Sequence, residues 1–194
     1  MKPIYKKIWK LALPYQDKRD DKGHAETVLH YALELLKDEK ADENIVIPAA
    51  ILHDIGWSQL SAEERFHSFV KNRGMKKEYA IRRKHENVGV KLAREVLKKA
   101  DYNPNLKKEI LEIISRHDTR HGFISKNEGI MRDADKLWRY SKTGFWLDVK
   151  RFKEPQKKWY ENARKKIELK DFFYSKSGKN IALHELRRRK EEFK

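Results

Sequence analysis

The sequence contains no cysteine, only 8 glycines among 194 residues, and no long apolar run. The absence of cysteine excludes disulfides, thiolate metal ligands and a cysteine nucleophile. No segment approaches the roughly 18 consecutive apolar residues that a membrane-spanning helix needs, and the apolar part of the N-terminus is too short for a signal peptide. We therefore expect a cytoplasmic protein with no membrane partner.

Apolar residues are also scarce, at 39%, while charged residues reach 39% and the formal net charge is +16. The apolar residues recur with helical spacing, which favours a folded, highly charged helical protein over a disordered one. No strand-like alternation persists and no internal repeat is visible. The sequence therefore predicts an all-α fold, with helices at 3–13, 22–38, 44–55, 61–72, 76–100, 104–118, 125–142, 155–169 and 179–193.

Histidine and aspartate side chains interrupt the apolar faces of these predicted helices. Positions three, four and seven apart share a helix face, and Asp54, for example, continues the apolar row of Ile47, Ala50 and Ile51. Histidine and aspartate are costly to bury unless something pairs them, and a divalent metal would pair all of them at once. The predicted metal ligands are His24, His53, Asp54, His85, His117 and Asp135.

A purely structural explanation has to be weighed for each of these residues. A single inward histidine is more often a core residue with satisfied hydrogen bonds, and this applies to His24 or His85 taken alone. Asp54 is harder to explain, because an unpaired buried charge costs several kcal/mol. The joint pattern favours a metal site, and His121, which follows a predicted helix end, is left open as a spare ligand. Three further histidines are predicted to face away from the site: His30, His67 and His184.

The order His, His-Asp, His, His, Asp, with AAILHDIG on one predicted helix and DADKL on a later one, resembles the HD superfamily of metal-dependent phosphohydrolases. The resemblance covers about residues 20–145 and implies a helical bundle with a metal site between core helices. It implies one ion held by His24, His53, Asp54 and Asp135, with His53 and Asp54 as the catalytic pair. In two-metal members, Asp54 would bridge to a second ion held by His85 and His117. We expect an HD domain at 1–150 and a basic helical C-terminal extension at 151–194 packed on it.

The chemistry of such a site follows from its donors. Paired divalent ions bind a phosphate oxygen, polarise the phosphorus and supply a hydroxide nucleophile at neutral pH. Imidazole and carboxylate ligands suit Mn, Fe, Zn, Co or Ni, and the resemblance favours Mn or Fe. The predicted activity is cleavage of a phosphate ester or anhydride of a nucleotide, or of a similar small anionic substrate, by metal-activated water.

Basic residues beside the predicted ligands are candidates for holding the substrate phosphate: Lys84, Arg116, Arg120, Lys136 and Arg139. Arginine grips phosphate as a fork, and lysine acts as a point charge. Because 46 of 194 residues are Lys or Arg, a solvated surface role stays open for each of them. Lys136 is the strongest candidate, since several nucleotide-cleaving proteins that resemble this chain carry a basic residue directly after the last aspartate.

Two sequence differences from known branches of the superfamily narrow the choice of branch for this chain. Trp57 follows HDIG where the cyclic-dinucleotide phosphodiesterases with a Gly-Tyr-Pro motif have lysine, and that tripeptide is absent. Glu63 and Glu64 lie too far along the chain to match the acidic residue of the one-metal nucleotidases. The general likeness is to small stand-alone HD proteins, some of which cleave nucleoside polyphosphates.

The C-terminal segment 150–194 carries 16 basic and 7 acidic residues, a net +9 of the total +16. Phosphate contacts and base stacking on its aromatic residues would suit a nucleic-acid partner. Amphipathic helices that pack these aromatics on the core explain the same pattern and are the favoured interpretation. The aromatic residues concerned are Trp159, Tyr160, Phe172, Phe173 and Tyr174.

Two other functions are left open by the sequence, as is a homo-oligomer. The six-ligand order also resembles the di-iron HD oxygenases that act on myo-inositol and on phosphonates. A nucleic-acid-binding protein with a vestigial site is the other alternative, and such a site should have lost ligands, whereas none is missing here.

Overall fold

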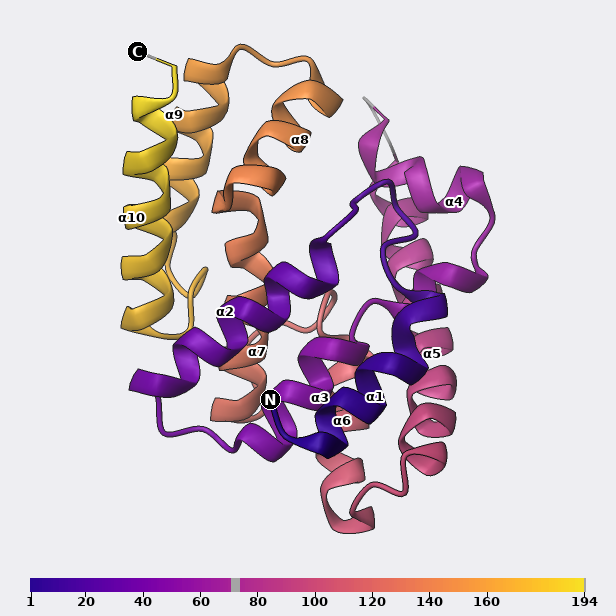
Figure 1. Cartoon of the computed structure of the whole chain (residues 1–194). Helices are drawn as coiled ribbons and strands as arrows, with labels where there is room; N and C mark the ends of the chain where they lie inside the picture. Colours follow the sequence, from indigo (N-terminus) through magenta and orange to yellow (C-terminus); the bar gives the residue numbers. More distant parts are fainter. Residues whose placement is uncertain (71–73, 194) are drawn as a thin grey trace.

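A computed structural model describes residues 1–70 and 74–193, and all regular structure within those ranges is helical (Figure 1). This confirms the all-α prediction. The α-helices are α1 (Pro3–Ala12), α2 (His24–Asp38), α3 (Glu43–Leu52), α4 (Ala62–Phe66), α5 (Met75–Lys99), α6 (Pro104–Arg116), α7 (Lys126–Leu137), α8 (Lys142–Phe152), α9 (Gln156–Ile167) and α10 (Lys176–Glu191). Short 3₁₀ helices are η1 (Leu13–Tyr15), η2 (Ile55–Gln59), η3 (His67–Phe69) and η4 (Trp138–Tyr140).

Helix α3 forms the centre of the bundle. Every residue from Ile45 to Leu52 is buried, because α1, α2, α6 and α7 all pack against it. Pro48 lies inside this helix and has no backbone N–H for the carbonyl oxygen of Asn44. The hydroxyl of Tyr102 donates a 2.6 Å hydrogen bond to that oxygen instead, so this partly buried carbonyl remains satisfied.

Polar side chains fix where the helices around α3 begin. Asp42 accepts a hydrogen bond from the backbone N–H of Asn44 at the start of α3, and Ser125 accepts one from Glu128 at the start of α7. Such caps satisfy N–H groups that have no partner inside the helix, typically contributing about 1 kcal/mol each. They set the register of the helices that carry His53 and Asp135.

Gly56 allows η2 to lie directly against α5. A Cβ atom built on Gly56 would lie 2.0 Å from the carbonyl oxygen of His85 and 2.6 Å from the backbone nitrogen of Gly89. No side chain fits at that distance, so glycine is required for this close approach. The contact brings the segment after α3 next to His85 on α5.

The C-terminal helices form a layer beside α7 (Figure 1). Helix α10 packs against α9 and α7, and its Leu186 is buried in the common core. The fully buried carboxylate of Asp133 on α7 accepts hydrogen bonds of 2.8 Å from the backbone N–H groups of Tyr174 and Ser175. This anchor joins the loop before α10 to the helix that carries Asp135. No helix in the described ranges has the length and apolar character needed to cross a membrane.

Several predicted helix boundaries were wrong. The helix predicted at 44–55 ends at Leu52, and the helix predicted at 125–142 ends at Leu137, where η4 and the capping residue Ser141 interrupt it. Helix α8 was not predicted, because the stretch of apolar residues with helical spacing is short there. The segment 61–72 divides into α4 and η3, and its last two residues lie outside the described residues. Helix α10 begins at Lys176 rather than at 179, because Ser175 caps it.

Candidate metal centre

Three of the predicted ligands form one cluster of donor atoms. His24 at the start of α2, His53 at the end of α3 and Asp135 on α7 place one donor atom each within 4.8 Å of one another. The Nε2 atoms of His24 and His53 are 3.2 Å apart, and they lie 3.5 and 3.4 Å from Oδ1 of Asp135. Both imidazoles are buried.

The other three predicted ligands form a second cluster beside the first. Asp54, His85 on α5 and His117 at the end of α6 again have donor atoms within 4.8 Å of one another. Oδ1 of Asp54 lies 3.5 Å from Nε2 of His85 and 3.2 Å from Nε2 of His117. These two Nε2 atoms are 3.5 Å apart.

Asp54 belongs to both clusters, because its two carboxylate oxygens face different histidines. Oδ2 lies 3.4 Å from Nε2 of His24 and 3.7 Å from Nε2 of His53, while Oδ1 faces His85 and His117. The sequence placed Asp54 on the helix, but α3 ends at Leu52 and the backbone leaves the helical conformation at Asp54. This turn projects the carboxylate between the two histidine pairs.

The four histidines are oriented in two different ways. Nδ1 of His53 donates to the carbonyl oxygen of Ala50 at 2.8 Å, and Nδ1 of His117 donates to that of Ile114 at 3.0 Å. A carbonyl oxygen can only accept, so Nδ1 carries the proton and Nε2 faces the cluster as a potential ligand.

His24 and His85 are instead held by aromatic rings. The indole of Trp57 stacks on His85 with 4.0 Å between ring centroids and 11° between planes. Trp138 meets His24 edge to face at a centroid distance of 5.2 Å. Aromatic packing therefore fixes the direction of these two Nε2 atoms.

The electrostatics of the cluster favour ionised carboxylates. Burial raises the pKa of Asp54, but the charge of His53 and hydrogen bonds from the other histidines outweigh it and hold the pKa well below its ordinary value. Burial lowers the pKa of His53, yet the charges of Asp54 and Asp135 outweigh that effect and raise the pKa to about 10. The cluster thus favours positive charge at its centre, as a divalent cation would provide. Four imidazoles and two carboxylates fit Mn, Fe, Zn, Co or Ni.

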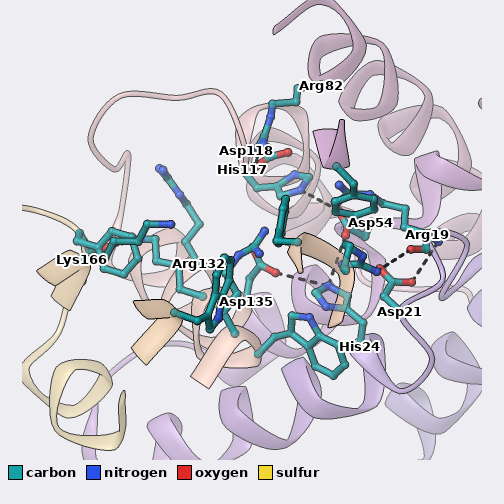
Figure 2. Close-up of a pocket in the computed structure, with 18 residues that line it drawn as sticks. Arg19, Asp21, His24, Asp54, Arg82, His117, Asp118, Arg132, Asp135 and Lys166 are labelled. Atoms are coloured by element: carbon teal, nitrogen blue, oxygen red, sulfur yellow. Dashed lines mark hydrogen bonds and ion pairs between the residues drawn. The ribbon is translucent and has the colours of Figure 1, made fainter. Parts of the chain in front are cut away.

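A cavity of about 360 Å³ opens beside the two clusters (Figure 2). His24, Asp54, His117 and Asp135 line it. Most of its remaining polar wall is cationic, so its potential should attract anions. The basic lining residues are Arg19, Arg82, Arg132, Lys136, Arg139, Arg151 and Lys166.

Two of the five predicted phosphate-binding residues line this cavity, Lys136 and Arg139. Lys136 Nζ donates to the carbonyl oxygen of Phe172, and burial lowers the pKa of its ammonium group. The predicted role of both residues in binding phosphate stays a prediction with this supporting geometry.

The structure does not bring the other three predicted phosphate-binding residues to the described cavity wall. Lys84 precedes His85 by one residue, about 100° around the helix, and pairs with Glu64 instead. Arg116 is exposed at the end of α6. Arg120 pairs with glutamates on α6 and α7. Nearness in sequence did not place these side chains near the ligands in space.

Other cavity residues were missed by sequence reasoning. Arg82 lines the cavity and donates a 2.5 Å hydrogen bond to Asp118, which directly follows His117. Burial raises the pKa of Asp118, but the charge of Arg82 outweighs it and lowers the pKa. The only sequence signal for Asp118 was that it directly follows His117, as Asp54 directly follows His53. Arg19, Asp21, Arg132 and Arg151 were also missed.

Asp148 orients two arginines of the cavity wall. Its fully buried carboxylate accepts a 2.7 Å hydrogen bond from Arg139 and a 3.1 Å hydrogen bond from Arg151. Arg151 also donates to the backbone carbonyls of Arg19 and Asp20 at 3.1 and 3.0 Å. One aspartate on α8 therefore fixes two cations and ties them to the loop before His24.

Glu86 supports the second cluster from behind. The carboxylate is fully buried and accepts hydrogen bonds from the backbone N–H groups of Asp118 and Thr119 at 2.9 and 3.0 Å. It also accepts from the Thr119 hydroxyl at 2.8 Å and from Arg83. These contacts fix the turn that follows His117, and Glu86 itself directly follows the predicted ligand His85.

The remaining histidines do not belong to either cluster. His30, His121 and His184 are exposed, and His67 is half-buried. The exposure of His30 and His184 agrees with the sequence prediction. His121 lies on the surface and supplies no donor to the described clusters.

Comparison with known protein families identifies the family of this chain. The HD domain family model matches residues 22–140, a range that includes all six clustered histidines and aspartates. No curated protein matches the chain, and no solved structure does either. The match extends over more than half of the 194 residues. With its two histidine and aspartate clusters joined by Asp54, the chain belongs to the HD domain family.

Proposed function

We propose that this protein is a metal-dependent phosphohydrolase that uses two divalent ions. The observation that carries the proposal is the pair of neighbouring donor clusters, with one Asp54 oxygen facing each, on the wall of a cationic cavity. Members of the HD family are usually hydrolases, which supports the reaction type. The native ions would be Mn or Fe by resemblance, held by the six clustered side chains.

The residues divide into two functional groups. The six ligands would hold ions that polarise a phosphate oxygen and lower the pKa of a water molecule toward neutrality. Arg82, Arg132, Lys136, Arg139 and Arg151 would neutralise the remaining phosphate charge from the surrounding wall. Asp118 has a lowered pKa and is a weak proton acceptor, so its role would be to orient Arg82.

The substrate would be a nucleotide or a similar small phosphorylated molecule. Seven basic side chains line a cavity of about 360 Å³, which is the size range of small-molecule sites. The seven basic residues outnumber the acidic residues of the wall, so a phosphorylated anion would complement its charge better than an uncharged sugar or alcohol. This favours hydrolysis over oxygenation of an uncharged substrate.

The proposal is tested by analysing the products of a nucleotide and phosphate-ester panel without oxygen. Manganese-loaded wild type and His53→Ala are incubated side by side, and His30→Ala serves as a control because His30 is exposed and outside both clusters. We expect phosphate-bond cleavage by wild type and His30→Ala only. Absence of cleavage with every compound, followed by substrate-dependent oxygen uptake by the iron-loaded protein, would assign the site to the oxygenase class.

The nucleic-acid-binding alternative receives less support from the structure. All six predicted ligands are present and clustered, which a vestigial site would not require. Tyr160 is buried, Phe172 and Phe173 pack against the core, and Trp159 lines the cavity. These aromatics therefore have intramolecular roles, although the basic surface of α10 still allows a nucleic-acid partner as a prediction.

A further inference from the structure

A second, mainly apolar recess of about 240 Å³ adjoins the metal-side cavity. Arg139, Trp159, Lys166 and Phe172 line both spaces, so the two are adjacent. Figure 2 shows Lys166 on the side of the cavity away from Asp54 and Arg19. A substrate bound at the ions would therefore extend its non-phosphate part towards this recess, which we call the α9 recess.

The α9 recess has the composition of a site for a flat heterocycle. Trp159 and Phe172 supply aromatic walls, and Tyr140 closes its inner side. Asn162 offers a side-chain amide that both donates and accepts hydrogen bonds, at an exposed edge of the recess. Aromatic walls with polar groups at the rim suit a nucleobase better than an alkyl chain, because an alkyl chain cannot form hydrogen bonds with those groups.

The recess is held in place relative to the metal ligands. Lys136, the residue after Asp135, donates from Nζ to the carbonyl oxygen of Phe172 and lies 5.4 Å from its ring centroid. On the other wall, Trp159 stacks on Phe152 with 5.2 Å between centroids and 15° between planes. A direct contact thus connects the Phe172 wall to the helix that carries a ligand.

Most of the recess lies outside the part of the chain that matches the family. The match ends at residue 140, whereas Trp159, Asn162, Lys166 and Phe172 all follow it. These residues belong to α9 and the loop before α10. The recess is therefore an addition of this chain's C-terminal extension to the metal-binding bundle.

We propose that the α9 recess binds the base of a nucleotide whose phosphate lies towards the ion clusters. This inference rests on the proposed function for the orientation of the phosphate. It assigns substrate selection to the C-terminal extension, with Trp159 and Phe172 contacting the base and Asn162 contacting its edge. The recess would allow the site to select a nucleotide over a simpler phosphate ester.

Equilibrium binding measured by calorimetry tests the proposal without depending on turnover. The probes are the four ribonucleoside 5′-monophosphates, ribose 5-phosphate and inorganic phosphate, each added to the manganese-loaded protein. We expect at least one nucleotide to bind about tenfold more tightly than ribose 5-phosphate, which corresponds to about 1.4 kcal/mol. Equal affinity for ribose 5-phosphate and every nucleotide would overturn the proposal.

Two variants locate the discrimination. Trp159→Ala should lose the preference for the nucleotide and keep the affinity for ribose 5-phosphate. The control is Trp146→Ala on α8, whose indole packs against Phe145 and Phe193 away from both cavities. Equal weakening of every probe by Trp159→Ala, with the fold intact by circular dichroism, would contradict a base-binding role.

If Trp159→Ala does not fold, Asn162→Ala replaces it, because this side chain is exposed and its change costs little packing. Alanine removes the amide donor and acceptor without adding charge, so the nucleotide preference should fall by several-fold while ribose 5-phosphate affinity is unchanged. An unchanged preference would count against the proposal. Nucleotide preference without any phosphate cleavage would support the recess and refute the hydrolase assignment, so the two failures are distinguishable.

Discussion

The two sides of the cavity are built differently. On the metal side, four histidines from α2, α3, α5 and α6 are buried, and each is fixed by a carbonyl oxygen or an aromatic ring. On the opposite side, Trp159 and Phe172 are half-buried, and Asn162 and Lys166 are exposed. Ion binding requires donors held in place, whereas a recognition surface functions with side chains at the edge of the fold.

Under the proposed function, this difference separates the chemical step from substrate selection. The metal side lies within the residues that match the HD family, and the α9 recess lies mainly beyond them. Changes on the metal side should therefore affect every substrate, and changes in the recess should affect only some. The following variants test that distinction, and they are given in order of decreasing expected effect.

The largest effect is expected from Asp54→Ala. Asp54 contributes one oxygen to each cluster, so its loss leaves both ions with incomplete ligand sets and one fewer negative charge. We expect loss of bound metal and a fall in kcat of about 10³-fold or more on every substrate, measured by elemental analysis and phosphate release. Asp38→Ala, an exposed aspartate on α2, is the matched control. Normal turnover by Asp54→Ala would break the assignment.

A smaller effect, confined to the second cluster, is expected from Glu86→Gln. The buried carboxylate holds the turn after His117, and removing its charge should loosen the second cluster while leaving His24, His53 and Asp135 in place. We expect the weaker-binding ion to lose about tenfold in affinity, as is typical of groups behind metal ligands. Manganese titration resolves the two sites. Equal weakening of both would indicate a general loss of structure.

A still smaller effect, on binding rather than chemistry, is expected from Asp148→Asn. Neutralising this buried aspartate frees Arg139 and Arg151 from their common partner. We expect KM to rise by several-fold to about tenfold, with kcat within about twofold of wild type. Asp171→Asn, an exposed aspartate in the loop before α10, controls for the charge change. A fall in kcat with unchanged KM would place these arginines in the chemical step instead.

The smallest effect concerns nucleic acid. Arg187 and Lys190 are exposed on α10, and Lys6 and Lys7 are exposed on α1. If the positive charge attracts nucleic acid without a defined site, charge reversal to glutamate at either pair should weaken binding of a single-stranded RNA equally, within about twofold. A selective loss for the α10 pair, measured by fluorescence anisotropy at fixed salt, would establish α10 as a nucleic-acid surface.

The metal side could be predicted from sequence because the histidines and aspartates there break a periodic apolar pattern. The cost of burying His85 or Asp54 unpaired is visible in the sequence itself. The break in the helix at Leu52 was not predicted, because the apolar spacing continues through Asp54 although the backbone does not. That turn, rather than the helix face, directs the carboxylate to both clusters.

Much of the cationic wall could not be predicted, because its residues come together only through tertiary packing. Helix α8 was missed, and with it Asp148, the residue that orients Arg139. In a chain with 46 basic residues, proximity in sequence to a ligand is a poor guide to the cavity, as Lys84 and Arg116 show. Arg82 reaches the wall from α5, three residues before His85 and on the same helix face.

The most direct test of the central claim is the electron paramagnetic resonance spectrum of the protein loaded with two equivalents of Mn²⁺. Ions bridged by the Asp54 carboxylate should give the spectrum of an exchange-coupled pair, and the Asp54→Ala variant should lose it. A spectrum of isolated Mn²⁺ ions in the wild type, unchanged by Asp54→Ala, would contradict a two-ion centre bridged by Asp54.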